Sequence, residues 1–194
     1  MPRMLIGAVV AAMAMFIIGF IFFATPLSAI GYSSADLTQQ ATVQQALAAN
    51  LPHTGTYSIP SPSDAATTNL YSKGPIATIH YNSLGYGVSE PDVLIAGFIH
   101  EFVVALLMGF ALLGIASSVT DFAVRARVVI LFSLAGTIFI HLGEPIWYHH
   151  DWRHFIYLMV GDTAMLVGGG LVIARWFLPR PSAAHAPVTV GAAD

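Results

Sequence analysis

Four long apolar segments divide this chain, and a lipid bilayer is the environment that suits them. The segments cover residues 4–24, 93–119, 128–147 and 155–178. A helix needs about 20 mainly apolar residues to cross the hydrocarbon core of a membrane. Because a backbone in lipid must satisfy its own hydrogen bonds, each segment is predicted to be helical. The sequence therefore predicts an all-α membrane protein, a bundle of four transmembrane helices.

The composition agrees with this class and excludes others. Hydrophobic residues make up 56% of the 194 residues and charged residues only 9%, whereas a soluble domain has about 25% charged residues. The net charge is -3 and no basic cluster occurs, so no nucleic-acid partner is expected. Cysteine is absent, which excludes disulfides and thiolate metal sites. No nucleotide-binding or hydrolase motif occurs, so the sequence predicts neither a nucleotide cofactor nor a catalytic residue.

The apolar segments set the expected domain boundaries. They are 1–31 for the first transmembrane helix, 32–91 for an extracytoplasmic (periplasmic) cap, 92–119, 126–147 and 153–178 for the other three helices, and 179–194 for a disordered cytoplasmic tail. The first segment has an alternative interpretation as a cleaved signal peptide. Its apolar run exceeds the roughly 7–15 residues usual in signal peptides, so we expect a retained anchor.

The basic residues predict the orientation of the bundle. Five arginines fall on one side of the membrane if the four helices alternate in direction: Arg3, Arg125, Arg127, Arg175 and Arg180. The positive-inside rule places that side in the cytoplasm, with both termini. The 32–91 segment and the 148–153 turn would then lie outside, in a multi-pass protein of the plasma membrane.

The 32–91 segment is expected to have its own secondary structure. Ser33 or Ser34 can cap a helix that runs to about Asn50. Residues 55–59 and 76–81 are expected to be strands, because turn-forming Pro and Gly residues bound them. A helix and a two-stranded ribbon are too small to be stable alone. We therefore expect them to form a cap on the outer ends of the bundle.

Two motifs in the first half of the chain point to a family. After the N-terminal anchor come Ala48-Ala-Asn-Leu-Pro-His-Thr-Gly-Thr-Tyr-Ser-Ile-Pro60 and Lys73-Gly-Pro-Ile-Ala77. With these motifs the chain resembles a family of uncharacterised bacterial integral membrane proteins. The resemblance implies a bacterial inner-membrane protein. The family has no assigned activity, so it implies no functional residue.

Ionisable residues inside the apolar segments are the best guide to function. They are His100, Glu101, His141, Glu144 and Asp162. With a helical rise of about 1.5 Å per residue, all five fall in the outer half of the bilayer. An ionisable group in hydrocarbon is costly, so each needs a partner or a function.

We expect four of these residues, on three helices, to line one cavity and bind a divalent transition metal, for transfer, sensing or catalysis. They are His100, His141, Glu144 and Asp162. Imidazole and carboxylate suit zinc, iron or copper. A further group near the outer mouth is expected to orient the ligands or to pass metal inward: Glu101, His149, His150, Asp151 and His154.

Other interpretations of the same residues remain open. In one, His100 and His141 ligate a haem axially, as in a small b-type cytochrome. In another, the protein is an accessory or assembly subunit whose polar side chains fasten helices together. A membrane protein partner would then bind the cap or the glycine-rich fourth helix. For the histidines at the mouth, a purely interfacial role is the simplest interpretation.

Overall fold

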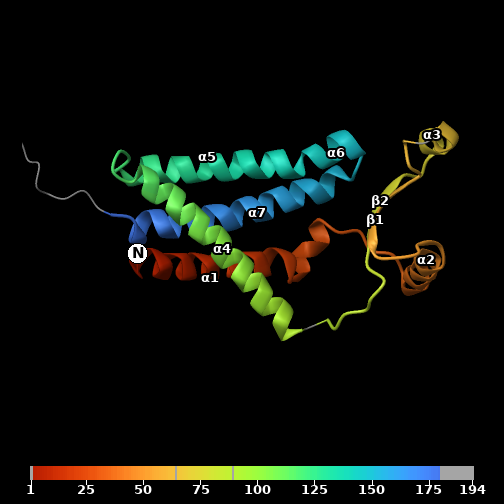
Figure 1. The fold of residues 1–194 in the computed structure, drawn as a ribbon, viewed down its shortest axis with the longest axis horizontal. Helices are drawn as coiled ribbons and strands as arrows, with labels where there is room; N and C mark the ends of the chain where they lie inside the picture. The colour runs from red at the N-terminus through yellow and green to blue at the C-terminus, as the bar shows by residue number, and fades with distance from the viewer. Residues whose placement is uncertain (1, 64, 89, 180–194) are drawn as a thin grey trace, which may run out of the picture.

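The computed structural model describes residues 2–63, 65–88 and 90–179 (Figure 1). Four of its helical spans are long and apolar enough to cross a membrane, which confirms the predicted number. They are α1 (Pro2–Phe23), α4 (Pro91–Ile115), α5 (Phe122–His141) continued by α6 (Gly143–Tyr148), and α7 (Trp152–Val172) continued by the π-helical turn η2 (Ile173–Phe177). Of the tail expected at 179–194, residues 180–194 lie outside the described residues.

The four spans do not pack evenly on one another. Helix α1 packs along both α4 and α7, and α5 packs mainly along α7. Figure 1 shows α4 crossing the bundle diagonally, close to α5 at the end near the N-terminus and far from it toward the cap. Helix α7 therefore lies at the centre, between α1 and α5.

Small residues make the central packing close. Ala8, Ala11 and Ala12 of α1 are fully buried. Opposite them in α7, a Cβ added to Gly169 would lie 2.6 Å from the sulfur of Met15, which is closer than real Cβ contacts come. The same Cβ would lie 3.5 Å from the backbone oxygen of Ala11, so the backbones of α1 and α7 come close together at this point, as is common between transmembrane helices.

The third span is not one continuous helix. It was expected to run over 126–147, but α5 ends at His141 and α6 begins at Gly143. Pro145 has no N–H to donate to the carbonyl of His141, so the helical ladder loses a bond at this point. Glu144 consequently belongs to the short helix α6.

The cap lies between α1 and α4 in the sequence. It begins with the short helix η1 (Pro26–Ile30), which the expected bounds assigned to the first transmembrane helix and which contacts both α1 and α7. Its other elements, α2 (Leu37–Asn50), β1 (Gly55–Ile59), α3 (Ala65–Lys73) and β2 (Ala77–Tyr81), lie beyond the bundle end in space (Figure 1). The strands pair antiparallel, with Gly55 opposite Tyr81. The expected helix and both strands are present, and α3 is an additional element that the sequence analysis missed.

The helix cap in this region is Asp36, and the expected Ser33 or Ser34 is not the capping residue. The Asp36 carboxylate accepts a hydrogen bond from the Gln39 N–H at 2.8 Å, and the Gln39 side chain accepts one from the Asp36 N–H at 3.1 Å. Two otherwise unpaired donors are thereby satisfied. This reciprocal pair fixes the start of α2 two or three residues later than Ser34 or Ser33 would.

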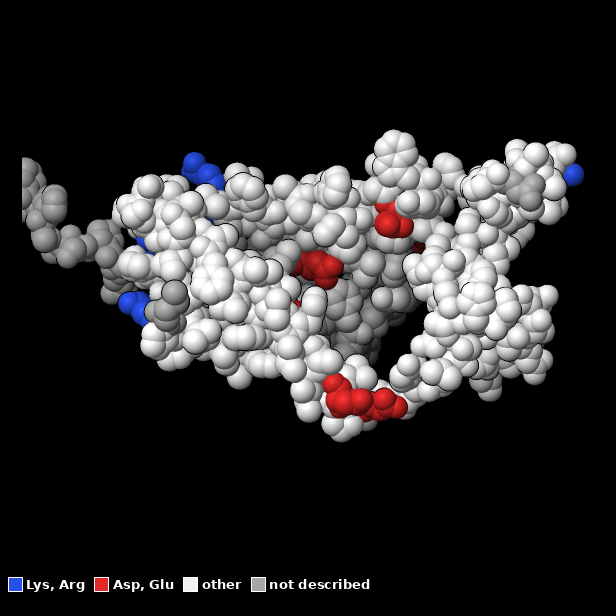
Figure 2. Space-filling view, in the orientation of Figure 1, with Lys and Arg blue, Asp and Glu red and all other residues white. Residues whose placement is uncertain are grey.

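Basic side chains gather at the bundle end away from the cap. Arg3 donates a hydrogen bond to the Trp176 carbonyl at 2.7 Å, and Arg125 donates one to the Pro179 carbonyl at 3.1 Å. On the face shown in Figure 2, most Lys and Arg side chains lie at this end, whereas Asp and Glu lie along the middle and toward the cap. The side of the membrane that this end faces stays a prediction.

Candidate functional site

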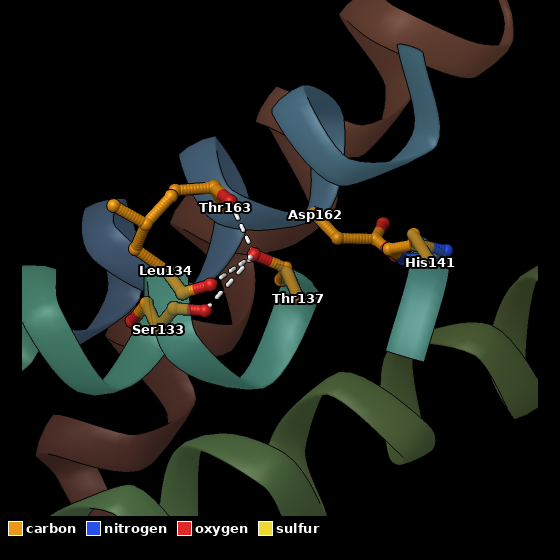
Figure 3. Close-up of polar contacts among 6 residues, drawn as sticks. All are labelled: Ser133, Leu134, Thr137, His141, Asp162 and Thr163. Atoms are coloured by element: carbon orange, nitrogen blue, oxygen red, sulfur yellow. Dashed lines mark hydrogen bonds and ion pairs between the residues drawn. The ribbon is translucent and has the colours of Figure 1, made fainter. Parts of the chain in front are cut away.

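The closest ionisable pair within the spans joins α5 to α7. His141 Nε2 lies 2.7 Å from Asp162 Oδ2 (Figure 3). The His141 side chain is 12% exposed and the Asp162 side chain 38%. The hydroxyls of Thr137, one turn before His141 in α5, and Thr163, the residue after Asp162 in α7, lie 2.6 Å apart. Two polar contacts therefore link the same two helices side by side.

The chemistry of the pair fixes the role of each nitrogen of His141. When Asp162 is ionised, its carboxylate only accepts hydrogen bonds, and Nε2–H of His141 is then the donor. In a neutral ring, Nδ1 then carries a lone pair. Among the described residues no protein group contacts that Nδ1. One nitrogen of His141 is therefore oriented by Asp162, and the other remains open to a further ligand or donor.

His100 and Glu101 of α4 form a looser pair. His100 Nδ1 lies 3.6 Å from Glu101 Oε1, and the His100 side chain is 74% exposed while that of Glu101 is 12% exposed. The Glu101 carboxylate also lies close enough to Asp162 for the two charges to repel each other. Glu101 thus faces the bundle and His100 faces its surroundings.

Glu144 and His150 form a second imidazole–carboxylate pair, at the cap end of the bundle. The Nδ1 atom of His150 lies 3.1 Å from Glu144 Oε2, although the angle is not that of a hydrogen bond. Its Nε2 lies 2.9 Å from the Thr78 hydroxyl of strand β2. The ring stacks on Phe155 with centroids 5.5 Å apart. His150 therefore connects α6 to the cap.

The N-terminus of α7 makes a second connection to the cap. His154 Nδ1 lies 3.0 Å from the Gly31 carbonyl. Arg153 donates hydrogen bonds to the carbonyls of Ile30 and Ala29. Asp151 accepts from the backbone N–H groups of Arg153 and His154 and so caps α7. These residues act on backbone groups where the helix and the cap meet.

His149 has a different role from the other histidines at the mouth. Its φ of 57° places it in the left-handed region, and it ends α6. Its side chain is exposed. The sharp turn at His149 directs the following residues into α7.

The structure divides the predicted site residues into separate pairs. His141 contacts Asp162, Glu144 contacts His150, and His100 contacts Glu101. Within the part of the chain that the structure describes, no group of three or more His, Asp or Glu side chains is arranged to hold a metal ion. His100 and His141, which in the alternative interpretation ligate a haem, each pair with a different carboxylate.

Sequence reasoning missed the residues that attach the cap. Thr78 and Gly31 contact histidines 72 and 123 positions away. A lone threonine in a strand and a backbone carbonyl carry no local signal for such contacts. Arg153 was visible as one of few basic residues on the cap side, and its position at the start of α7 was the available clue.

Comparisons with known proteins give no family for this chain. No protein-family model matches it, and neither the curated proteins nor the solved structures yield a significant match. The resemblance to bacterial integral membrane proteins therefore stays an expectation from two short motifs.

Proposed function

We propose that this membrane protein is an accessory or assembly subunit of a larger membrane complex, and that a partner protein binds its cap. The observation that carries the proposal is the exposure of apolar side chains in the cap. Several of its apolar residues are more than half exposed, among them Leu37, Val43, Leu70, Leu84 and Tyr86. Leu37 and Val43 belong to α2 and Leu70 to α3, and both helices lie beyond the ends of the membrane-spanning helices (Figure 1). Exposed apolar surface outside a bilayer is typical of protein interfaces.

The loose packing of the cap supports the same proposal. Helices α2 and α3 bury none of their described residues. A cavity of about 560 Å³ lies between α2 and β2, with Val43, Leu47 and Ile79 in its lining. Such a layer buries too little apolar surface to be stable by itself. A partner that covers α2 would supply the missing contacts.

The polar contacts at the bundle end fit a role in fastening. His150 and His154 hold the cap at two points, on β2 and on the turn after η1. His141 and Asp162 hold α5 to α7. In this proposal most of the ionisable residues serve to fix the cap to the bundle, and the fixed cap presents α2 to the partner.

Site-specific crosslinking tests the proposal. A photoreactive residue at Val43 should give a product heavier than the chain alone in intact membranes, and a photoreactive residue at Gln45, on another face of α2, should give little. The substitution Val43→Glu should shift the complex to a smaller species on a native gel, and the matched Gln45→Glu should leave it unchanged. A free monomer in wild-type membranes, with no product at either position, contradicts the proposal.

Metal binding remains a second candidate because of His141 and Asp162. Ligating histidines commonly donate their other ring N–H to a carboxylate, as His141 does here. Its open Nδ1 could then bind a divalent transition metal. Because the described residues contain no group of three or more His, Asp or Glu side chains that could hold a metal ion, further ligands would come from water or from a partner.

Elemental analysis tests this second candidate. Wild-type protein purified without chelator or a histidine tag should contain zinc, iron or copper in near-stoichiometric amount, and His141→Ala should lose it. Glu144→Ala, at the pair that contacts His150, serves as the comparison. Near-zero metal in all three proteins leaves the subunit proposal alone.

A further inference from the structure

An apolar cavity lies at the cap end of the bundle, between α7, η1 and the end of α1. Its volume is about 440 Å³. The lining is Phe22, Leu27, Ile30, Arg153, Ile156, Tyr157 and Val160. The four α7 residues follow the spacing of one helix face and extend over about 10 Å of depth. The cavity is therefore a slot that runs along α7 from the cap end toward the middle of the membrane.

The floor of the slot is held in place. The Tyr157 hydroxyl donates a hydrogen bond to the Phe22 carbonyl, and the two rings lie 5.9 Å apart. A Cβ added to Gly31 would lie 2.4 Å from the Tyr157 ring. Since Tyr157 is fixed from both sides, its ring cannot turn to fill the cavity.

Arg153 lies at the cap end of the slot, and among the described residues its positive charge has no carboxylate counter-ion. Its Nε donates to the Ile30 carbonyl and its Nη2 to the Ala29 carbonyl. Both acceptors are neutral, and no carboxylate among the described residues lies within ion-pair distance of the guanidinium. A guanidinium has five N–H donors, so three have no protein acceptor in the described part of the chain.

The depth of Arg153 in the membrane determines which acceptors its free N–H groups can reach. Exposed aromatic residues near the start of α7, Trp147, Tyr148 and Trp152, are typical of the depth of lipid headgroups. At that depth the abundant acceptor is a lipid phosphate. Arginine binds phosphate through paired, charge-assisted hydrogen bonds.

We propose that this slot binds a membrane phospholipid, with an acyl chain along Ile156 and Val160 and its phosphate on Arg153. The apolar walls receive the chain, and the free guanidinium N–H groups receive the headgroup. The bound lipid covers the junction between η1 and α7, where the cap leaves the bundle. The site is independent of the proposed partner on α2.

Native mass spectrometry of the whole protein in detergent tests this assignment. Delipidated protein is mixed with dioleoylphosphatidylglycerol, with dioleoylglycerol, or with inorganic phosphate. The phospholipid should bind about tenfold more tightly than dioleoylglycerol, which lacks the phosphate. Equal binding of the two lipids, or binding of inorganic phosphate as tight as that of the phospholipid, would overturn the proposal.

Two substitutions separate the site from general lipid contact. Arg153→Gln should weaken phospholipid binding about tenfold, and Arg127→Gln, at an exposed arginine of the opposite end, should not. Arg153 also holds η1, so its replacement could act through those contacts. A second variant, Val160→Phe, fills the slot and leaves them intact. It should reduce the bound phospholipid, and Ile130→Phe, on an exposed position of α5, should not. Wild-type binding in Val160→Phe, or equal losses in the controls, would refute the site.

Discussion

His150 Nε2 lies 2.9 Å from Thr78 Oγ1, and this contact holds a strand of the cap to the turn between α6 and α7. The imidazole is mostly buried between Tyr148 and Phe155, with its Nδ1 near Glu144. The position of the ring is therefore set by the bundle, and Thr78 binds to a ring that is already in place. The cap depends on this contact more than the bundle does.

Removal of the Thr78 hydroxyl should loosen the cap. Thr78→Val keeps the side-chain shape and deletes the hydrogen bond, which is worth about 1 kcal/mol. We expect hydrogen exchange of the β2 amides to speed up several-fold, with no change in α7. His149→Asn, which tolerates the left-handed backbone at that position, is the control. Equal exchange in Thr78→Val and wild type would mean that the cap is held elsewhere.

The pair of His141 and Asp162 should show coupling in a double-mutant cycle. Either His141→Leu or Asp162→Leu alone leaves one polar group in the membrane without its partner, whereas the double replacement leaves none. We expect the double variant to be more stable than the sum of the single losses predicts, by about 1 kcal/mol. Thermal unfolding in detergent measures it. Additive losses would show that the contact contributes nothing to stability.

Arg125 should be the most sensitive arginine of the chain. It is buried, and its guanidinium donates hydrogen bonds to the carbonyls of Val119, Ala116 and Pro179. Arg125→Gln should lower the free energy of unfolding by about 3 kcal/mol, because bonds to charged donors are lost and carbonyls are left unpaired. Arg127→Gln, at an exposed arginine, should have little effect. Similar unfolding temperatures for both variants would contradict this account.

The predicted orientation can be checked by cysteine labelling, since the chain has no cysteine of its own. Ser72→Cys lies exposed in α3 and Ser118→Cys lies exposed in the loop before α5. In intact cells a membrane-impermeant maleimide should label the first and not the second. The reverse pattern would place the cap in the cytoplasm.

The membrane-spanning helices were predictable because each needs a long apolar run, and such runs are visible in the sequence. Long apolar runs leave the backbone no alternative to helix, so the boundaries of α1, α4 and α7 follow closely from composition. The break at Leu142 needed the local effect of Pro145. Helix α3 was missed because it is only nine residues long and is rich in Thr, Asn and Ser, residues that are also common in loops.

The site was less predictable than the fold. Equal depth placed His100, His141 and Asp162 at one level, but depth does not give rotation. His100 and Glu101 are adjacent in a helix, so at most one of them faces the bundle centre, and that residue is Glu101. Glu144 was drawn away from His141 because the helix restarts at Gly143, and it meets His150 instead.

Because α7 packs closely on both α1 and α5, it determines the order in which the helices can pair during synthesis. Helices α1 and α4 contact each other directly and can pair as soon as both are in the membrane. Helix α5 packs mainly on α7, so it enters the bilayer before its principal neighbour has been made. A nascent chain that ends after Tyr148 therefore has its third span unpaired, and Asp162 has not yet arrived to meet His141. Insertion of α7 closes the four-helix bundle, and until then α5 is an unpaired helix that insertion factors and membrane proteases can reach.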